Sequence, residues 1–254
     1  MKKSLLCYAF LLCLSHPLWA SNNAATPLYS PNGFYIGGNV GGTFPNIDNN
    51  NYLTSGMGWP NDQYHYKQAN SSALMSLLGG YTWATHREWL PFYSLGLNYT
   101  YVFPSKLSGN INQYSLPEFN NYDFQYKIQR QTLLAILKMD IYRWANFMPF
   151  LSLGAGVSVN RAYDYDENAV PNVTSRVSPG FGSSSSTNFS YMIGAGVDLI
   201  AMNNFVMGLE YNYGYFGNAK TGYGNNGNSN SRLSTRLNSN TIVLSANYYF
   251  DKLA

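Results

Sequence analysis

The sequence predicts an all-β protein, an eight-stranded antiparallel up-and-down transmembrane β-barrel, and three observations support this prediction. Apolar residues recur at every second position in about eight segments, which is typical of strands with one apolar face. The face opposite the apolar side chains carries small, uncharged residues where a water-covered sheet would carry charges. The chain is 17% aromatic and only 11% charged, about half the charge of an ordinary soluble domain. This combination favours strands that contact lipid on one face and line a crowded polar interior on the other.

Tyrosine is the commonest aromatic residue of the chain. There are 23 Tyr, 14 Phe and 5 Trp. Tyrosine and tryptophan prefer the boundary between membrane and water, where the ring is buried and its polar tip stays hydrated. The composition is therefore that expected of a barrel with an aromatic girdle at each boundary. Lys and Arg number 15 against 12 Asp and Glu, so the charge gives no argument for a nucleic-acid partner.

The chain begins with a segment typical of a secretory signal peptide. Lys2 and Lys3 precede an apolar run over residues 5–14, and a proline and a small residue follow it. The run is too short for an uncleaved anchor, which needs about 18 to 20 apolar residues. We expect residues 1–20 to be removed and residues 21–32 to form an N-terminal segment. Both cysteines lie in the expected signal peptide, so the mature chain would have no disulfide and no cysteine metal ligand.

The first three strands are expected at residues 34–42, 73–83 and 93–103. The first is rich in glycine, which permits close approach and strong curvature. The alternation is clearest in the third strand, whose apolar face comprises Tyr93, Leu95, Leu97, Tyr99, Tyr101 and Phe103. Its opposite face carries mainly small polar residues, which predicts that the apolar face meets lipid.

The fourth strand, which ends near residue 141, is the least regular. Every second residue from 133 to 141 is apolar, but Phe124, Tyr126 and Ile128 occupy the opposite phase. A β-bulge inserts one extra residue and so reverses the phase of the side chains that follow it. We therefore expect a bulge or a change of register near residues 129–132.

The last four strands are expected at residues 151–160, 189–199, 205–215 and 242–250. Each alternates aliphatic or aromatic residues with Gly, Ser, Asn or a rare charge, which is again the pattern of a strand between lipid and a polar interior. An even number of strands places both ends of the barrel on the same side of the membrane.

The connections alternate between short and long, as in outer-membrane barrels. Short connections fall near residues 84–91, 142–148 and 201–204. Long segments fall near residues 43–72, 104–122, 161–187 and 217–238. They are rich in Asn, Ser, Gly and Tyr, which is typical of loops. The sequence thus predicts a barrel over residues 33–250 with four long extracellular loops, followed by a tail at 251–254.

Four charged residues fall on the inward face of the predicted strands: Lys138, Asp140, Asp198 and Glu210. A charge directed at lipid is costly, so the barrel interior is their natural location. They could form a path for protons or ions, or a structural network of ion pairs and hydrogen bonds. The interior of an eight-stranded barrel is just wide enough to be filled by side chains, which favours the structural network.

A catalytic site is not expected, although one combination of residues was considered. His65 lies near Asp62 in the first long segment, and Ser71 and Ser72 follow it. Such a trio would suit a lipid-modifying enzyme, but its spacing matches no known signature. His86 is expected in a short connection on the other side of the membrane, so the two histidines cannot share a metal.

Two further patterns resemble ligand sites without predicting one. Asp164, Asp166 and Glu167 could hold calcium loosely, but they lack the spacing of a calcium-binding loop. The glycine pairs at 154/156 and 194/196 lack the third glycine of a dinucleotide site and lie within strands, so barrel packing explains them better. We expect no cofactor and no metal.

Several short motifs resemble the OmpA-like eight-stranded outer-membrane β-barrel family of Gram-negative bacteria. They are Gly33-Phe34-Tyr35-Ile36-Gly37-Gly38, the two Gly-Ala-Gly-Val segments at 154–157 and 194–197, Leu209-Glu210-Tyr211-Asn212-Tyr213 and Asn247-Tyr248-Tyr249-Phe250. The resemblance covers nearly the whole mature chain, and we expect no periplasmic peptidoglycan-binding domain after the barrel.

The resemblance implies a non-enzymatic outer-membrane protein whose extracellular loops serve surface interaction or envelope integrity. A small pore or hydrophobic-compound channel, similar to the OmpW-like relatives, is the first alternative, and a lipid A-modifying enzyme is the second. A soluble lipocalin-like barrel is the architectural rival. The implied partners are outer-membrane lipid and lipopolysaccharide, the barrel-insertion machinery, and an extracellular or host ligand of the loops. The protein is expected to be a monomer that binds no nucleic acid.

Overall fold

The computed structural model describes residues 32–47, 51–53, 60–85, 87, 89–174, 176–202, 204–225 and 231–250. The expected signal peptide, nearly all of the N-terminal segment, the tail at 251–254 and His86 lie outside these residues. All strands belong to one compact unit, Ser30–Leu253. Within the described part of the chain, no helix has the length and apolar character needed to cross a membrane.

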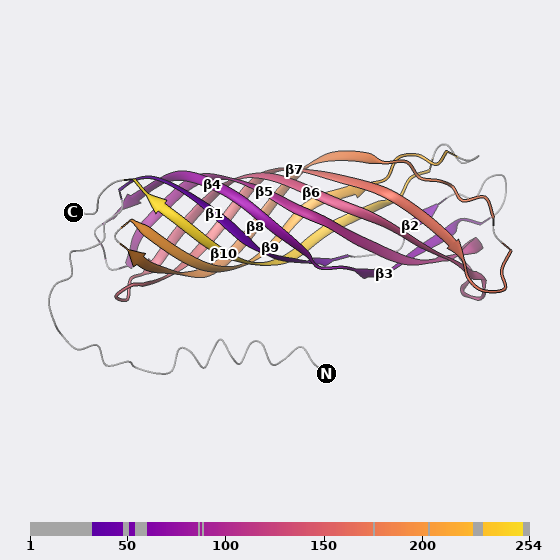
Figure 1. The fold of residues 1–254 in the computed structure, drawn as a ribbon, viewed down its shortest axis with the longest axis horizontal. Coiled ribbons are helices and arrows are strands. Elements are labelled where there is room, and N and C mark those ends of the chain that lie inside the picture. The colour runs from indigo at the N-terminus through magenta and orange to yellow at the C-terminus, as the bar shows by residue number, and fades with distance from the viewer. Residues whose placement is uncertain are drawn as a thin grey trace, which may run out of the picture. The chain divides into compact units, whose positions relative to one another are not determined.

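Ten β-strands and two short 3₁₀ helices make up the described fold (Figure 1). They are β1 (Gly33–Asn46), β2 (Asn51–Leu53), β3 (Asp62–Ala69), β4 (Ser72–Ala84), β5 (Trp89–Asn112), η1 (Gln113–Ser115), η2 (Pro117–Phe119), β6 (Asn120–Tyr142), β7 (Phe147–Ala169), β8 (Ser184–Met202), β9 (Phe205–Lys220) and β10 (Ser234–Tyr249).

Eight of these strands close into a ring. The order is β1, β4, β5, β6, β7, β8, β9 and β10, and β10 pairs with β1. Every pairing in the ring is antiparallel. The predicted eight-stranded up-and-down barrel is therefore confirmed. Closure leaves no unpaired edge, which is the condition for a sheet to cross a membrane.

The two remaining strands prolong the ring rather than add to it. β3 pairs with β5 just beyond the place where β4 stops: Ala69 lies opposite Leu107, and Leu74 lies opposite Val102. Because β3 and β4 run in the same direction along β5, they behave as one long strand with an irregular step at Asn70. The three-residue β2 pairs with β3 in turn.

The lipid-facing pattern predicted for 93–103 is confirmed. Leu95 and Leu97 are 51% and 59% exposed on the outside of the barrel, whereas Ser94 is buried inside it. The same alternation holds on β1, where Phe34, Ile36 and Val40 are exposed outward. An apolar surface of this extent is stable only in contact with hydrocarbon.

The connections differ at the two ends of the barrel, as predicted. At one end, which we call the short-turn end, few residues join β4 to β5, β6 to β7 and β8 to β9. At the other end, the long-connection end, the strands continue into all four segments that the sequence assigned to loops. β5, β6 and β7 are 24, 23 and 23 residues long, about twice the 9–11 residues that cross a membrane. The loop assignment was therefore wrong for much of these segments.

The bulge or register change predicted near residues 129–132 is found only in part: β6 keeps its side-chain alternation, but the register of its pairing with β5 shifts opposite Gln129. Side chains at even positions face inward without interruption from Tyr122 to Asp140, and the pairing of Gln129 to Thr132 with β7 is regular. What changes is the chemistry of the two faces. Towards the long-connection end the interior becomes apolar and the exterior polar, as expected of a strand that leaves the membrane. The nearest irregularity lies on the neighbouring β5, between Val102 and Ser105.

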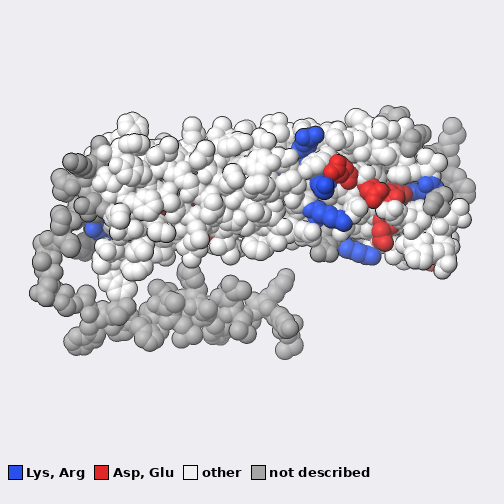
Figure 2. All heavy atoms as spheres, viewed as in Figure 1, with Lys and Arg blue, Asp and Glu red and all other residues white. Residues whose placement is uncertain are grey.

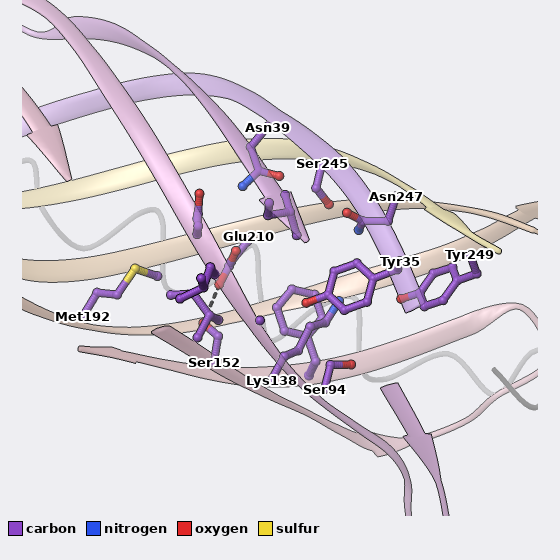
Figure 3. Close-up of a pocket in the computed structure, with 16 residues that line it drawn as sticks. Tyr35, Asn39, Ser94, Lys138, Ser152, Met192, Glu210, Ser245, Asn247 and Tyr249 are labelled. Carbon is purple, nitrogen blue, oxygen red and sulfur yellow. Dashed lines mark hydrogen bonds between the residues drawn. The ribbon is translucent and has the colours of Figure 1, made fainter. Parts of the chain in front are cut away.

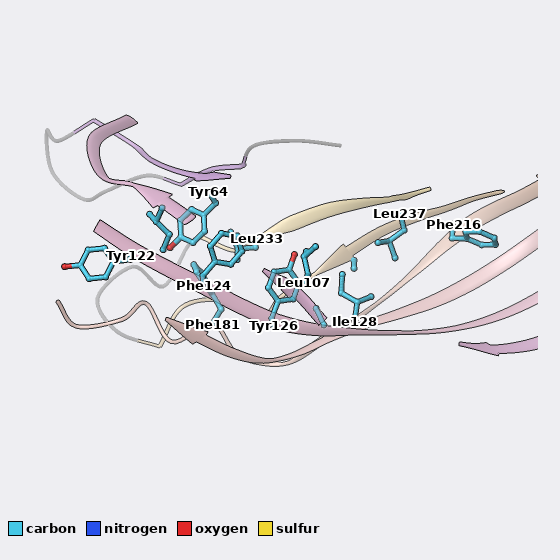
Figure 4. Packing of buried hydrophobic residues seen from close by; sticks show 13 residues of the cluster. Tyr64, Leu107, Tyr122, Phe124, Tyr126, Ile128, Phe181, Phe216, Leu233 and Leu237 are labelled. Carbon is cyan, nitrogen blue, oxygen red and sulfur yellow. The ribbon is translucent and has the colours of Figure 1, made fainter. Parts of the chain in front are cut away.

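The part of the barrel beyond this reversal, which we call the extension, has a hydrophobic core of its own (Figure 4). Its buried members are Tyr64, Leu107, Ile111, Tyr122, Phe124, Tyr126, Ile128, Ala162, Phe181, Phe216, Ala219, Leu233 and Leu237. The rings of Tyr64 and Phe124 meet edge to face with centroids 5.1 Å apart. Such packing is typical of a water-soluble interior, so the interior of the extension resembles the core of a soluble protein rather than the polar lumen.

Candidate functional site

The four predicted interior charges line the membrane-spanning part of the lumen. Lys138 on β6 forms an ion pair with Asp198 on β8, and the Asp198 side chain is only 2% exposed. Asp140 is buried two positions further along the inward face of β6. Glu210 on β9 accepts a hydrogen bond from the hydroxyl of Ser152 on β7. The barrel thus brings together charges from β6, β8 and β9.

Aromatic rings confine these charges. The Lys138 ammonium lies 3.9 Å from the centroid of the Phe150 ring, a cation–π contact. Tyr35 and Tyr249 lie on the paired strands β1 and β10 with ring centroids 5.5 Å apart. Both rings are buried in the lumen near its short-turn end (Figure 3).

The described part of the lumen contains two small cavities of about 50 Å³ each. The residues that line both are Asn39, Asn98, Met192 and Glu210. A volume of this size holds only a few water molecules, so side chains fill most of the lumen, as the sequence analysis expected from the strand number.

A cation–π pair terminates the polar lumen on the side of the extension. The guanidinium carbon of Arg130 lies 3.6 Å from the centroid of the Phe216 ring, and Arg130 Nη1 donates to Ser239 Oγ at 3.2 Å. Arg130 is buried, and both residues line the cavity nearer the extension; Phe216 also belongs to the core of the extension. Polar lumen and apolar core therefore meet at this pair, which we call the seal.

The glycine pairs within strands β7 and β8 fulfil the packing role expected of them. A methyl group at Gly194 would lie 1.9 Å from Asn212 Oδ1 and 2.4 Å from Ser152 Oγ. At Gly196 it would lie 2.5 Å from the Phe150 ring. Such contacts are impossible without movement of the neighbours. Glycine at these positions leaves the space that Ser152 and Glu210 need to meet.

The trio considered as an enzyme site does not assemble. Asp62 is buried towards the interior of the extension, whereas His65 is an odd number of positions away on the same strand and faces outward. Asp62 accepts the backbone N–H of Tyr114 at 3.1 Å, and the Ser72 hydroxyl donates to the carbonyl of Phe103 at 2.6 Å. Aspartate, histidine and serine therefore have separate structural surroundings.

The acidic residues considered for calcium are also dispersed. Asp164 pairs with Lys127 at 3.0 Å, and Asp166 accepts from Gln125 at 3.1 Å. The Glu167 side chain is buried and pairs with Arg176. Among the residues that the structure describes, no group of three His, Cys, Asp or Glu side chains is arranged to hold a metal ion.

Arg176, which the sequence analysis did not identify, joins the connection after β7 to the strands. Its Nη1 lies 2.5 Å from Asp62 Oδ2 and its Nε lies 2.8 Å from Glu167 Oε1. Its guanidinium carbon lies 4.7 Å from the Tyr122 ring centroid. Burial alone would lower the pKa of Arg176, but the hydrogen bonds to Glu167 and Asp62 outweigh it and raise the pKa above its ordinary value.

Arg130 and Phe216 were missed for an identifiable reason. Arg130 lies in the inward phase of the fourth predicted strand, inside the segment where a bulge was expected, and Phe216 follows the end of the seventh. The sequence did contain a signal, because even-numbered positions of β6 face inward without interruption. This pattern would have predicted a buried arginine at residue 130, between an apolar and a polar part of the interior.

Comparisons with known proteins agree with this architecture. Residues 9–250 match the model of a family described as the outer membrane protein β-barrel domain. A search among curated proteins finds no match.

Solved structures give a similar result. The chain is similar to the outer membrane protein OprG from Pseudomonas aeruginosa, with 16% identity and a TM-score of 0.50 over 86% of this chain and 96% of that one. Neisserial surface protein A matches with 16% identity and a TM-score of 0.42 over 86% and 97%. The outer membrane protease OmpT from Escherichia coli matches with 14% identity and a TM-score of 0.43 over 87% and 95%. At these identities the likeness to OprG concerns the fold alone.

Proposed function

Because this chain belongs to the outer membrane protein β-barrel family, we propose that it is a closed, non-enzymatic barrel that holds a rigid extension outside the cell for surface interaction. The protein is located in the outer membrane of a Gram-negative bacterium, as its family is. Outer-membrane barrels have short turns in the periplasm and long connections outside. The long-connection end, with the extension, is accordingly assigned to the exterior.

The observation that carries the proposal is the hydrophobic core of the extension. Thirteen buried residues fill its interior, among them Tyr64, Phe124 and Tyr126. A channel mouth would be open and hydrated, whereas this core excludes water from the axis of the barrel. The seal of Arg130 and Phe216 supports the same conclusion at the inner end of the core.

The ion-pair cluster around Arg176 supports a rigid outer surface. It fixes the connection after β7 to Asp62 on β3 and Glu167 on β7. Tyr165 strengthens it by donating to Glu167 Oε2 at 2.6 Å. A surface that is fixed in this way binds a partner with a smaller loss of conformational entropy than a flexible loop does.

Labelling of single cysteines on intact cells tests the orientation. The mature chain is expected to lack cysteine, so Val177→Cys, at a position 79% exposed, would be the one thiol present. A membrane-impermeant maleimide should label this variant on intact cells. The matched control is Asn146→Cys in the short turn between β6 and β7, which should react only after the cells are opened. Labelling of Asn146→Cys alone on intact cells would reverse the orientation.

Planar-bilayer recording and lipid analysis test the other parts of the proposal. We expect no single-channel current from the purified chain at either polarity. Steady current that disappears on neutralising Lys138 or Glu210 would instead favour the pore. The lipid A mass spectrum should be the same for cells with the protein, without it and with its His65→Ala variant. A modification that depends on the protein would refute the non-enzymatic assignment.

A further inference from the structure

We propose that side-chain oxygens in the lumen bind a sodium ion near the short-turn end of the barrel. The site consists of Asn39, Asp198, Ser245 and Asn247, which we call the oxygen cluster. Three of these residues, Asn39, Ser245 and Asn247, line the cavity of about 50 Å³ that is drawn in Figure 3. The inference goes beyond the proposed function and does not depend on the orientation of the barrel.

The pairing of the strands brings the oxygen cluster together. Asn39 on β1 lies directly opposite Ser245 on β10, and Asn247 is the next inward-facing residue of β10. Ser245 in turn lies opposite Gly208 on β9, which lies opposite Asp198 on β8. The four oxygen-bearing side chains therefore occupy neighbouring positions on the inner face of the barrel, with one glycine among them.

Two glycines leave the space that these oxygens occupy. A methyl group at Gly208 would lie 2.6 Å from Asp198 Oδ1 and closer still to Ser245 Oγ, so both oxygens point into the same space. A methyl group at Gly37, which lies opposite Asn247, would collide with Asn247 Oδ1. The Asn247 oxygen thus lies over β1, and Asn39 is the next inward-facing residue of that strand.

Three oxygens of the cluster are buried acceptors that receive no hydrogen bond from the described residues. They are Asn39 Oδ1, Asp198 Oδ1 and Asn247 Oδ1. Asn39 is 8% exposed and Asn247 is 4% exposed. A buried acceptor without a partner destabilises the folded state. One water molecule donates only two hydrogen bonds, whereas a metal cation attracts every oxygen that surrounds it. A cation therefore satisfies the cluster better than a water molecule does.

The charges around the cluster also favour a cation. Asp140, Asp198 and Glu210 all lie near enough to Lys138 to interact with it electrostatically. Lys138 forms its ion pair with Asp198 Oδ2, and not with the oxygen that points towards Ser245. One ammonium thus stands among three carboxyl groups, and a medium of low polarity strengthens their attraction for a further positive charge.

The outer wall of the barrel does not supply that charge. On the face shown in Figure 2, Lys, Arg, Asp and Glu gather towards the long-connection end, and the rest of the surface is almost uncharged. Arg130, the other buried cation of the lumen, lines the cavity nearer the extension. The compensating charge is therefore expected inside the lumen.

The ligand set indicates a monovalent ion. Carboxylate and amide oxygens suit hard cations, and proteins bind Na⁺ through such oxygens as well. Ca²⁺ takes about six to eight oxygen ligands, and Mg²⁺ keeps several water molecules. The cavity of about 50 Å³ has little room for either arrangement, and Asp198 is the single carboxylate of the cluster. Such a set has no signature in the sequence, because its members lie on three different strands.

Unfolding in two salts tests whether Na⁺ binds. The purified full-length protein in detergent is compared in sodium chloride and in N-methylglucamine chloride at equal ionic strength, since N-methylglucamine is too large for the cavity. We expect the unfolding equilibrium constant to be about tenfold smaller in sodium chloride, because an ion that binds only the folded state stabilises it. Equal stability in the two salts would overturn the proposal. Stabilisation by Ca²⁺ but not by Na⁺ would also overturn it.

Two uncharged substitutions test the ligands. Asn39→Leu and Asn247→Leu each remove one amide oxygen at similar volume and leave every charge in place, so the difference between the salts should disappear. The matched control is Asn160→Leu. Its amide oxygen is also buried without a partner, but its Nδ2 donates to the Phe216 carbonyl at 2.7 Å, near the extension. The control should keep the full difference. Persistence of the difference in both cluster variants, or its loss in the control, would contradict the assignment.

Ser245→Ala is a milder variant in case the leucine variants fail to fold, which heat-modifiable gel mobility reveals. It removes one hydroxyl ligand, and we expect the difference between the salts to fall to about threefold. Sodium NMR gives a readout that is independent of stability. The sodium signal should broaden with the unmodified protein and with Asn160→Leu, and much less with Ser245→Ala. A sodium signal that the unmodified protein leaves unchanged would refute the site.

Discussion

Arg130 on β6 and Phe216 on β9 meet across the interior of the barrel, with the guanidinium carbon 3.6 Å from the ring centroid. Both side chains line the cavity nearer the extension, and Phe216 also belongs to the apolar core of the extension. The face of the ring attracts the cation. The seal therefore joins the interior of the membrane-spanning part to the core of the extension.

Removal of the Phe216 ring should weaken the whole barrel. We expect Phe216→Ala to lower the free energy of unfolding by about 3–5 kcal/mol, because the ring is buried and its loss leaves a cavity. Phe216→Leu keeps apolar volume and loses the cation–π contact, so its cost should be smaller, about 1–2 kcal/mol. Urea unfolding in detergent, followed by tryptophan fluorescence, measures both. A cost near zero for Phe216→Leu would show that the Arg130 contact contributes little beyond packing.

The ion pair between Lys138 and Asp198 should respond as a unit. Lys138→Met leaves the Asp198 carboxylate buried without its cation, and we expect it to cost about 3–5 kcal/mol of unfolding free energy. Adding Asp198→Asn should recover part of this loss, because the uncompensated charge is then removed. Glu210→Gln is the control that leaves the pair intact. Strictly additive effects in the double-mutant cycle would contradict a direct coupling between the two residues.

The close approach at Gly194 leads to a prediction about packing. Gly194→Ala should destabilise the barrel by about 1–3 kcal/mol, since the added methyl group would overlap Asn212 and Ser152. Gly79→Ala is a matched control, because a methyl group there meets only the carbonyl oxygen of Tyr35 at an ordinary 3.5 Å. The gel-shift temperature of the two variants compares them directly. A similar loss of stability in both variants would mean that replacing any strand glycine has this effect, and that crowding in the lumen does not cause it.

The buried tyrosines of the extension predict a loss of stability at alkaline pH. Burial raises the pKa of Tyr126 well above its ordinary value. In this case the folded state holds its proton more tightly than the unfolded state does. Stability is then fully present below the unfolded pKa of about 10 and falls as the pH rises above it. We expect the slope of unfolding free energy against pH, above pH 10, to reach about 1.4 kcal/mol per pH unit for each such tyrosine.

The variant Tyr126→Phe tests this assignment. It removes the hydroxyl that bonds to Thr235 at 2.6 Å and to Tyr66 at 3.1 Å, so it should be less stable than the unmodified protein near neutral pH. Its alkaline slope should nevertheless be shallower. An unchanged slope would assign the alkaline loss to other groups.

The sequence was sufficient to predict the barrel, its strand number and the lipid-facing side of each strand. These features follow from the alternation of side chains between the two faces of a strand, which depends only on local geometry. The alternation led to a prediction at β6 that holds only in part. There the apolar residues switch from even to odd positions, and this switch was interpreted as a change of register. In the structure the environment changes while the side-chain alternation of β6 is kept, so Phe124 and Lys138 face the same interior in different surroundings.

The lumen charges were predictable as inward-facing residues, but their partners were not. Lys138 and Asp198 are 60 positions apart, and their contact depends on how the ring closes across β6, β7 and β8. The contact between Arg176 and Asp62 spans 114 positions and involves a segment without strand periodicity. Contacts of this kind are set by tertiary geometry and carry no local signature.

The two-sided chemistry of β6 constrains how this protein is made. The outer half of the strand bears Asp123 and Lys127 on one face and aromatic rings on the other. With the proposed orientation, those ionised groups would have to cross the bilayer during biogenesis, and the rings could pack together only after they had crossed. The extension would then be completed last, and a delay would leave an aromatic surface exposed outside the cell. A variant with a shortened extension should therefore assemble faster, but it would lack part of the mature structure.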